Sequence, residues 1–194
     1  MSEKTLSRRT LVLLVALPAL LCGAIGLTHP AHLNAGAAEY WRNMHIALIP
    51  IFPLIGVAPW LIARRAGPWF GRAAALLGYG FAVFYTSLDL LAGVAGGALV
   101  ASGHPDSTGQ VFAVARALGS IGVVSLVLGC IVAGIAAYRV AGLSALPGAL
   151  IAAVGAVLIQ PGHVYLGLGT GAMLLTAGGF VILAFSVTRA SPAT

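Results

Sequence analysis

Residues 140–188 decide the fold class of this chain. They read VAGLSALPGALIAAVGAVLIQPGHVYLGLGTGAMLLTAGGFVILAFSVT and contain no Asp, Glu, Lys or Arg. An α-helix rises 1.5 Å per residue, so about 20 residues cross the ~30 Å hydrocarbon core of a bilayer. The run is too long for one such helix, and Gln-Pro-Gly-His at 160–163 marks a turn within it. We therefore predict a helical hairpin whose two arms, about 143–159 and 164–187, cross a membrane.

The composition of the whole chain extends this interpretation. Of its 194 residues, 60 % are hydrophobic and 7 % are charged, whereas a soluble domain carries about a quarter charged residues. This composition excludes an ordinary cytosolic enzyme and a disordered tail, and two cysteines cannot build a disulfide framework. Apolar runs of membrane length give one domain, residues 1–194, with six predicted spans: about 10–28, 44–63, 72–100, 111–138, 143–159 and 164–187.

The few basic residues predict the orientation. Most of them flank one set of span ends, and positive residues favour the cytoplasmic side. We predict an all-α, polytopic six-helix bundle of three hairpins with both termini in the cytoplasm. The Ala-, Gly- and Arg-rich composition is typical of a bacterium with a GC-rich genome, which makes the inner (plasma) membrane the expected location. The cytoplasmic set is Lys4, Arg8, Arg9, Arg64, Arg65, Arg72, Arg139 and Arg189, and the outer set is Arg42 and Arg116.

The histidines all gather at the predicted outer end. Each outward loop, about 29–43, 101–110 and 160–163, carries a His beside a Pro or Gly turn. Neutral imidazole is the commonest protein ligand for Zn, Cu, Ni and Fe, so histidines converging from three hairpins would form a metal site with an open position. No familiar zinc motif is present, and any single one of these histidines also suits a solvent-exposed turn. The candidate ligands are His29, His32, His45, His104 and His163.

Two carboxylates are candidates for a catalytic role. Asp89 lies about 25 Å along the third span from Arg72, and an acid within a span normally faces the bundle interior or a water-filled cavity. It either forms a structural ion pair with Arg116 at similar depth or serves the site as a base or ligand orienter. Glu39, about two turns before His45, is the second candidate.

Three functions are compatible with these residues. The first is a membrane metalloprotein or metalloenzyme that binds Zn or Cu and acts on a small molecule arriving from the lipid or from outside. The second is a non-catalytic small transporter or accessory subunit of a membrane complex. The third, a b-type haem protein with His45 and His163 as axial ligands, is less favoured because both residues start spans at the lip of the bundle.

The expected partners follow from the same features. The lipid bilayer is the first, and further copies of the chain or other membrane subunits are the second. A nucleic-acid partner is not expected, because the net charge of +6 comes from basic residues at span ends rather than on a phosphate-binding face. Whether the chain is an enzyme stays open at this level.

Overall fold

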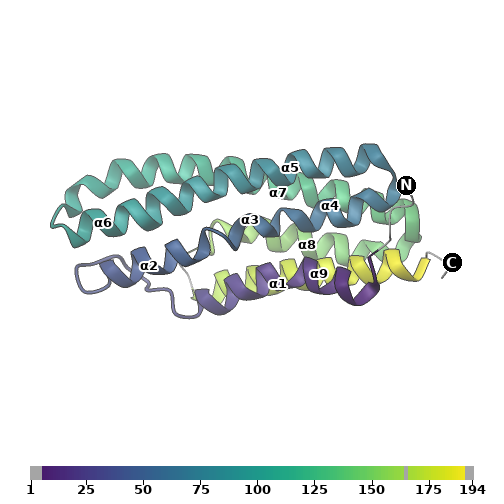
Figure 1. The fold of residues 1–194 in the computed structure, drawn as a ribbon, viewed down its shortest axis with the longest axis horizontal. Helices are drawn as coiled ribbons and strands as arrows, with labels where there is room; N and C mark the ends of the chain where they lie inside the picture. The colour runs from purple at the N-terminus through teal and green to yellow at the C-terminus, as the bar shows by residue number, and fades with distance from the viewer. Residues whose placement is uncertain (1–5, 164–165, 191–194) are drawn as a thin grey trace.

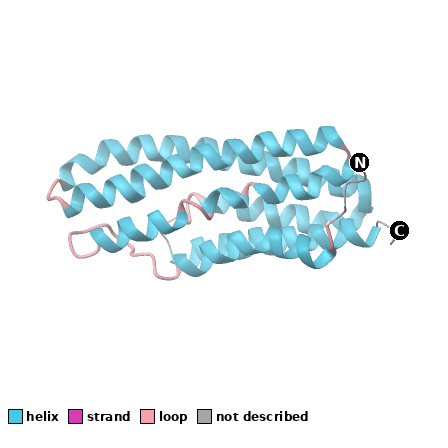
Figure 2. Cartoon of the chain, viewed as in Figure 1, coloured by secondary structure: helices cyan, strands magenta, loops and turns pink. Residues whose placement is uncertain are grey.

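The structure of this chain is a computed structural model that describes residues 6–163 and 166–190. Over these residues it is helical and contains no strand, so the predicted all-α class is confirmed for the described part (Figure 2). The elements in chain order are α1 (Arg8–Gly26), α2 (Ala38–Leu48), α3 (Phe52–Ile55), α4 (Val57–Ala63), η1 (Arg64–Ala66), α5 (Pro68–Leu88), the π-helix η2 (Asp89–Ala95), α6 (Gly96–Ala101), η3 (Pro105–Ser107), α7 (Thr108–Ala141), η4 (Gly142–Ala145), α8 (Leu146–Ile159) and α9 (Leu166–Ala190).

Four to five segments qualify as membrane spans by length and apolar composition, where the sequence predicts six. The four are Arg8–Gly26, Pro68–Ala101, Pro105–Ile159 and Gly167–Ala190. The fifth is the pair Ala38–Leu48 and Phe52–Ala66, bent by 40°, when the two pieces count as one. The long third segment holds both α7 and α8, which are separated by the short 3₁₀-helix η4, and this accounts for one of the missing predicted spans. The first two residues of the sixth predicted span, 164–165, lie outside the described residues.

The second predicted span is broken near Pro50 and Pro53. The chain turns at residues 49–51, and Pro53 lies in the first turn of the short helix α3 that follows. Proline lacks a backbone N–H and restricts the residue before it, so a continuous helix is disfavoured here. A close contact holds the broken segment against α5: a Cβ added at Gly56 would lie 2.5 Å from the carbonyl oxygen of Gly78. Two glycines are therefore required at this crossing.

The helices form a bundle whose members differ in length. α5, η2 and α6 run continuously beside α7, and α9 packs against both α1 and α8 (Figure 1). The chain enters α1 and leaves α9 at the same end of the bundle, while α2 and α6 lie at the other end. The long pair extends beyond the ends of α1, α8 and α9 there. This difference in length positions the site described below.

The surface of the bundle suits a lipid environment. Large apolar side chains are exposed along the helices, with Leu76 at 71 % and Leu150 at 67 % exposure, while Phe81 and Phe180 fill the core. The described basic residues of the predicted cytoplasmic set lie at the end where α1 begins, and Lys4 lies outside the described residues. Two of them stack on tryptophans, Arg64 on Trp60 and Arg72 on Trp69, as is common at a membrane–water interface.

Candidate metal centre

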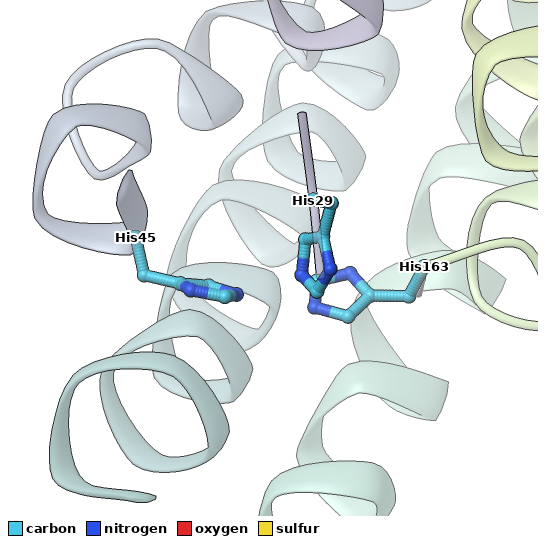
Figure 3. A group of neighbouring side chains, drawn as sticks. All are labelled: His29, His45 and His163. Atoms are coloured by element: carbon cyan, nitrogen blue, oxygen red, sulfur yellow. The ribbon is translucent and has the colours of Figure 1, made fainter. Parts of the chain in front are cut away.

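Three of the five predicted ligands meet in the structure. His29 follows α1, His45 lies in the last turn of α2, and His163 lies in the turn after α8. One ring nitrogen from each residue lies within 4.8 Å of the other two, and the ring centroids are 5.2 to 6.0 Å apart. Figure 3 shows the three rings approaching one another from separate parts of the chain. Three residues far apart in sequence thus form one cluster of potential metal-ligand nitrogens.

Each ring is oriented by a hydrogen bond at Nδ1. His29 Nδ1 donates to the carbonyl oxygen of Pro30, and His45 Nδ1 donates to that of Trp41, both over 2.7 Å. A carbonyl can only accept, so both neutral rings keep the lone pair on Nε2. His163 Nδ1 is 2.9 Å from the hydroxyl oxygen of Tyr85, and donation to that oxygen leaves its Nε2 lone pair free as well. Metal-binding histidines are commonly held by such a bond at the other ring nitrogen.

The three Nε2 atoms share a second property. Each is buried and has no hydrogen-bond partner among the described residues. A buried polar atom without a partner costs roughly 1–3 kcal/mol, so native proteins contain few of them. Three such atoms of one kind at one point, all with lone pairs, are the arrangement that a bound cation would satisfy.

The protonation state of the two loop histidines fits this arrangement. Burial lowers the pKa of His29, although its bond to the Pro30 carbonyl opposes the shift. Burial, and to a smaller extent the neighbouring imidazoles of His45 and His29, together lower the pKa of His163 to about 3. Both rings are therefore neutral at pH 7, which is the form that binds a metal.

Asp89 adds a carboxylate to the cluster. It is the first residue of η2, is 0 % exposed, and places Oδ1 3.8 Å from Nε2 of His163. Neither of its carboxylate oxygens has a hydrogen-bond partner among the described residues. Among the described residues the predicted ion pair with Arg116 is not formed: Arg116 is exposed, and the basic side chain near Asp89 is that of His163, whose ring is neutral. A buried carboxylate beside a neutral imidazole is costly, and a metal ion beside it would balance its charge.

The π-helix and α2 are fitted to each other around His45. A Cβ added at Gly93 would overlap the ring of His45, so glycine is needed where this ring packs on η2. Trp41 donates from Nε1 to the carbonyl oxygen of Ala92 over 3.1 Å, and its ring packs edge-on against His29 with centroids 4.6 Å apart. Isolated π-helical turns are frequent at functional sites. Trp41 and Gly93 thus position two of the three rings.

The other predicted site residues lie outside the cluster. His32, His104 and Glu39 are exposed, and His104 contacts Ser102 within its own loop. The physical reason for the position of His104 is helix length: α6 and α7 carry their connecting loop past the ends of the shorter helices (Figure 1). Tyr85, Trp41 and Gly93 are not among the predicted site residues. For Tyr85 a signal exists, because a hydroxyl one turn before an acid inside a span can share its environment.

A small cavity of about 30 Å³ adjoins the cluster. Its lining includes His29, His163 and Tyr85, together with Cys22 and Thr170. A cavity of this size can hold a water molecule where polar groups are present. The centre therefore has room for one small ligand besides the protein groups.

Over the described residues, fold and site together define an all-helical, membrane-type chain with a three-imidazole cluster whose Nε2 atoms are buried. No protein-family model, no curated protein and no solved structure matches this chain. The chemistry of the cluster is therefore the ground for assigning a function.

Proposed function

We propose that this chain is a bacterial multi-pass inner-membrane protein that binds a transition metal through His29, His45 and His163. The observation that carries the proposal is the convergence of three buried Nε2 atoms without partners, each on a ring whose Nδ1 is already engaged. A single histidine in a turn has many explanations. Three histidines whose free Nε2 atoms converge on one point are explained together by a shared metal ion.

The proposed topology has six crossings with both termini in the cytoplasm. The bent pair α2 to α4 counts as one crossing, and the hairpin of α7 and α8 counts as two. Support comes from the basic side chains at the end where α1 begins and from the near absence of Lys and Arg at the other end. On this topology the metal centre belongs to the extracytoplasmic half of the bundle.

Zinc is the metal that we propose first, with copper as the alternative. Zn²⁺ binds imidazole nitrogen at about 2.0–2.1 Å, which separates tetrahedral ligand atoms by about 3.3–3.4 Å. From separations of up to 4.8 Å, the three nitrogens would close by as much as about 1.5 Å around the ion. His29 and His163 lie in a loop and a turn, where such an adjustment is easiest. The carboxylate of Asp89 is buried next to the cluster, and its negative charge favours binding of a divalent cation at the three neutral imidazoles.

A three-imidazole centre leaves one metal position open. Zinc lowers the pKa of a bound water to about 7, which supplies hydroxide as a nucleophile at neutral pH. A bound metal would supply the activated water, and Asp89, whose Oδ1 lies 3.8 Å from Nε2 of His163, would accept the proton that the water loses. This transfer would convert water to hydroxide and the carboxylate to a carboxylic acid, so charge and atoms balance. This would make the protein a membrane metalloenzyme of the hydrolytic type.

The haem alternative fits the geometry less well. A haem would need two of the three histidines on opposite faces of a planar ring far larger than a water molecule. The cavity next to His29 and His163 holds about 30 Å³, and a third imidazole lies equally close. A single metal ion uses all three donors, whereas haem would leave one of them unpartnered.

The test is metal analysis of detergent-purified protein. We expect one Zn²⁺ per chain, lost in His45→Ala and in His163→Ala, and retained in the matched control His104→Ala. Far-ultraviolet circular dichroism and gel filtration check that each variant is folded. Absence of stoichiometric metal in the wild-type protein, or its full retention in folded His45→Ala and His163→Ala, would overturn the proposal. A Soret band would identify the haem alternative instead.

A further inference from the structure

We infer that the ligand of this centre is an amphiphile with an apolar chain and an anionic phosphate or carboxylate head, which enters from the lipid beside His163. The inference rests on the proposed metal centre, because it places the polar head of the ligand next to that site. Its evidence is separate from that of the metal: an apolar groove, its connection to His163, and an unpaired guanidinium at the groove.

The groove has a volume of about 710 Å³ and is open to the outside of the bundle. Ligand sites commonly range from about 300 to 1,000 Å³. Its walls come from α2, α5, η2, α7 and α8, from the loop after α1 and from the turn after α8. Most of the lining side chains are apolar, among them Leu33, Leu88, Phe112, Val123 and Val157. Such walls suit a hydrocarbon chain.

His163 connects the groove with the metal centre. It lines both the groove and the small cavity beside the cluster, and Trp41 also belongs to the groove wall. A ligand in the groove would therefore lie against the imidazole whose Nε2 is a proposed metal ligand. His45 is 0 % exposed and does not line the groove, so among the described cluster residues the groove meets His163.

Arg116 gives the groove a positive charge. Arg116 is exposed and lines the groove, and no carboxylate pairs with it among the described residues. Gln160 fixes the neighbouring backbone, because its Nε2 donates to the carbonyl oxygen of Arg116 over 3.1 Å and to the Ser120 hydroxyl over 2.9 Å. A guanidinium free of internal partners binds phosphate or carboxylate through paired N–H donors. This favours an anionic head over a neutral one.

The experiment measures binding of a fluorescent lysophosphatidate to the detergent-purified protein as isolated. Val157→Trp should fill the groove and weaken binding about tenfold or more. Val154→Trp, an exposed position of α8 outside the groove lining, should leave binding within about twofold. Arg116→Gln should weaken binding of lysophosphatidate about tenfold, the loss expected for one charge-assisted hydrogen bond, and should leave a monoacylglycerol of equal chain length unaffected.

Two further arms separate the sources of the ligand and the two proposals. Inorganic phosphate should not displace the probe at concentrations where unlabelled lysophosphatidate does; displacement by phosphate alone would show a site for a free anion and overturn the inference. Equal binding by Val157→Trp and the wild type would also overturn it, while leaving the metal centre intact. Metal content is measured on the same samples. A wild type without metal refutes the proposed function, and the probe then reports on the groove alone.

Discussion

Substitution of Gly93 by alanine tests whether the proposed metal centre depends on the fit between η2 and α2. The new methyl group would overlap the ring and Cβ of His45. Non-bonded carbon atoms are most stable at about 3.5–4.0 Å, so His45 or the helix that carries it must retreat by more than about 1 Å. Metal–ligand distances hold to within about 0.2 Å, and His45 lies in a helix rather than in an adjustable loop, so a shift of this size is expected to remove it as a ligand. Gly93→Ala should therefore act on metal binding much as His45→Ala does.

The magnitudes follow from the same overlap. Overpacking a well-filled interior costs about 1–3 kcal/mol, so the variant should be less stable than the wild type but still folded. Loss of one of three protein ligands should lower zinc affinity by at least about 100-fold, the upper end of what loss of a supporting hydrogen bond costs. Affinity is measured by competition with a chromophoric chelator, and stability by thermal unfolding in the same detergent.

A matched control separates the ligand effect from a general effect of alanine in a helix. Gly171 lies in α9, and a Cβ added there meets nothing within 4 Å. Gly171→Ala should leave zinc affinity unchanged and stability equal or slightly higher, because alanine is the better helix former. If Gly93→Ala binds zinc as tightly as Gly171→Ala, while His45→Ala does not, the proposed dependence of the centre on this packing is refuted.

Three other predictions concern groups around the centre. Asp89→Asn should lower zinc affinity about tenfold or more in the competition assay. It should leave the metal-free protein at least as stable in thermal unfolding, because it removes a buried carboxylate that has no hydrogen-bond partner and only the neutral His163 ring beside it. Tyr85→Phe should lower zinc affinity about tenfold by releasing Nδ1 of His163, with little loss of stability, because its ring still packs on Phe52 and Phe81. The metal-free protein should lose stability as the pH falls from 6.5 toward 3. The pKa of His163 is about 3 in the folded protein, so the unfolded chain takes up the proton first. The free energy of unfolding should fall by up to about 1.4 kcal/mol per pH unit over this range. His163→Gln should flatten that dependence, and a folded variant with the wild-type pH profile would contradict the assignment.

The helices were predictable from the sequence, because long apolar runs and their Pro and Gly breaks determine where a membrane-type helix can form. Pro50 and Pro53 disfavour a continuous helix, and the structure has a complete break there with a separate short helix. Packing then holds the broken segment against α5. Gly56 and Gly78 bring two backbones together at this level, and sequence alone does not show which glycines meet across helices.

The candidate site was predictable as a region and not as a set of residues. All five histidines belong to the predicted outer end, but the sequence pattern does not show how far along the bundle axis each of the three loops lies. Depth depends on helix length, and the third and fourth predicted spans were already the longest, at about 72–100 and 111–138. Their loop, with His104, extends past the other two, so it cannot reach the point where His29 and His163 meet.

The same difference in length explains how a site made from loops becomes buried. His29 and His163 follow the ends of shorter helices, which would leave them at the lip of a bundle with helices of equal length. Here the longer α5–η2–α6 segment continues past them, and α2 packs on that extension and brings His45 to 0 % exposure. His45 is thus covered by this packing, and the groove reaches the cluster at His163. A ligand that reaches the metal would therefore approach sideways between helices, which is the route available to a molecule dissolved in the bilayer.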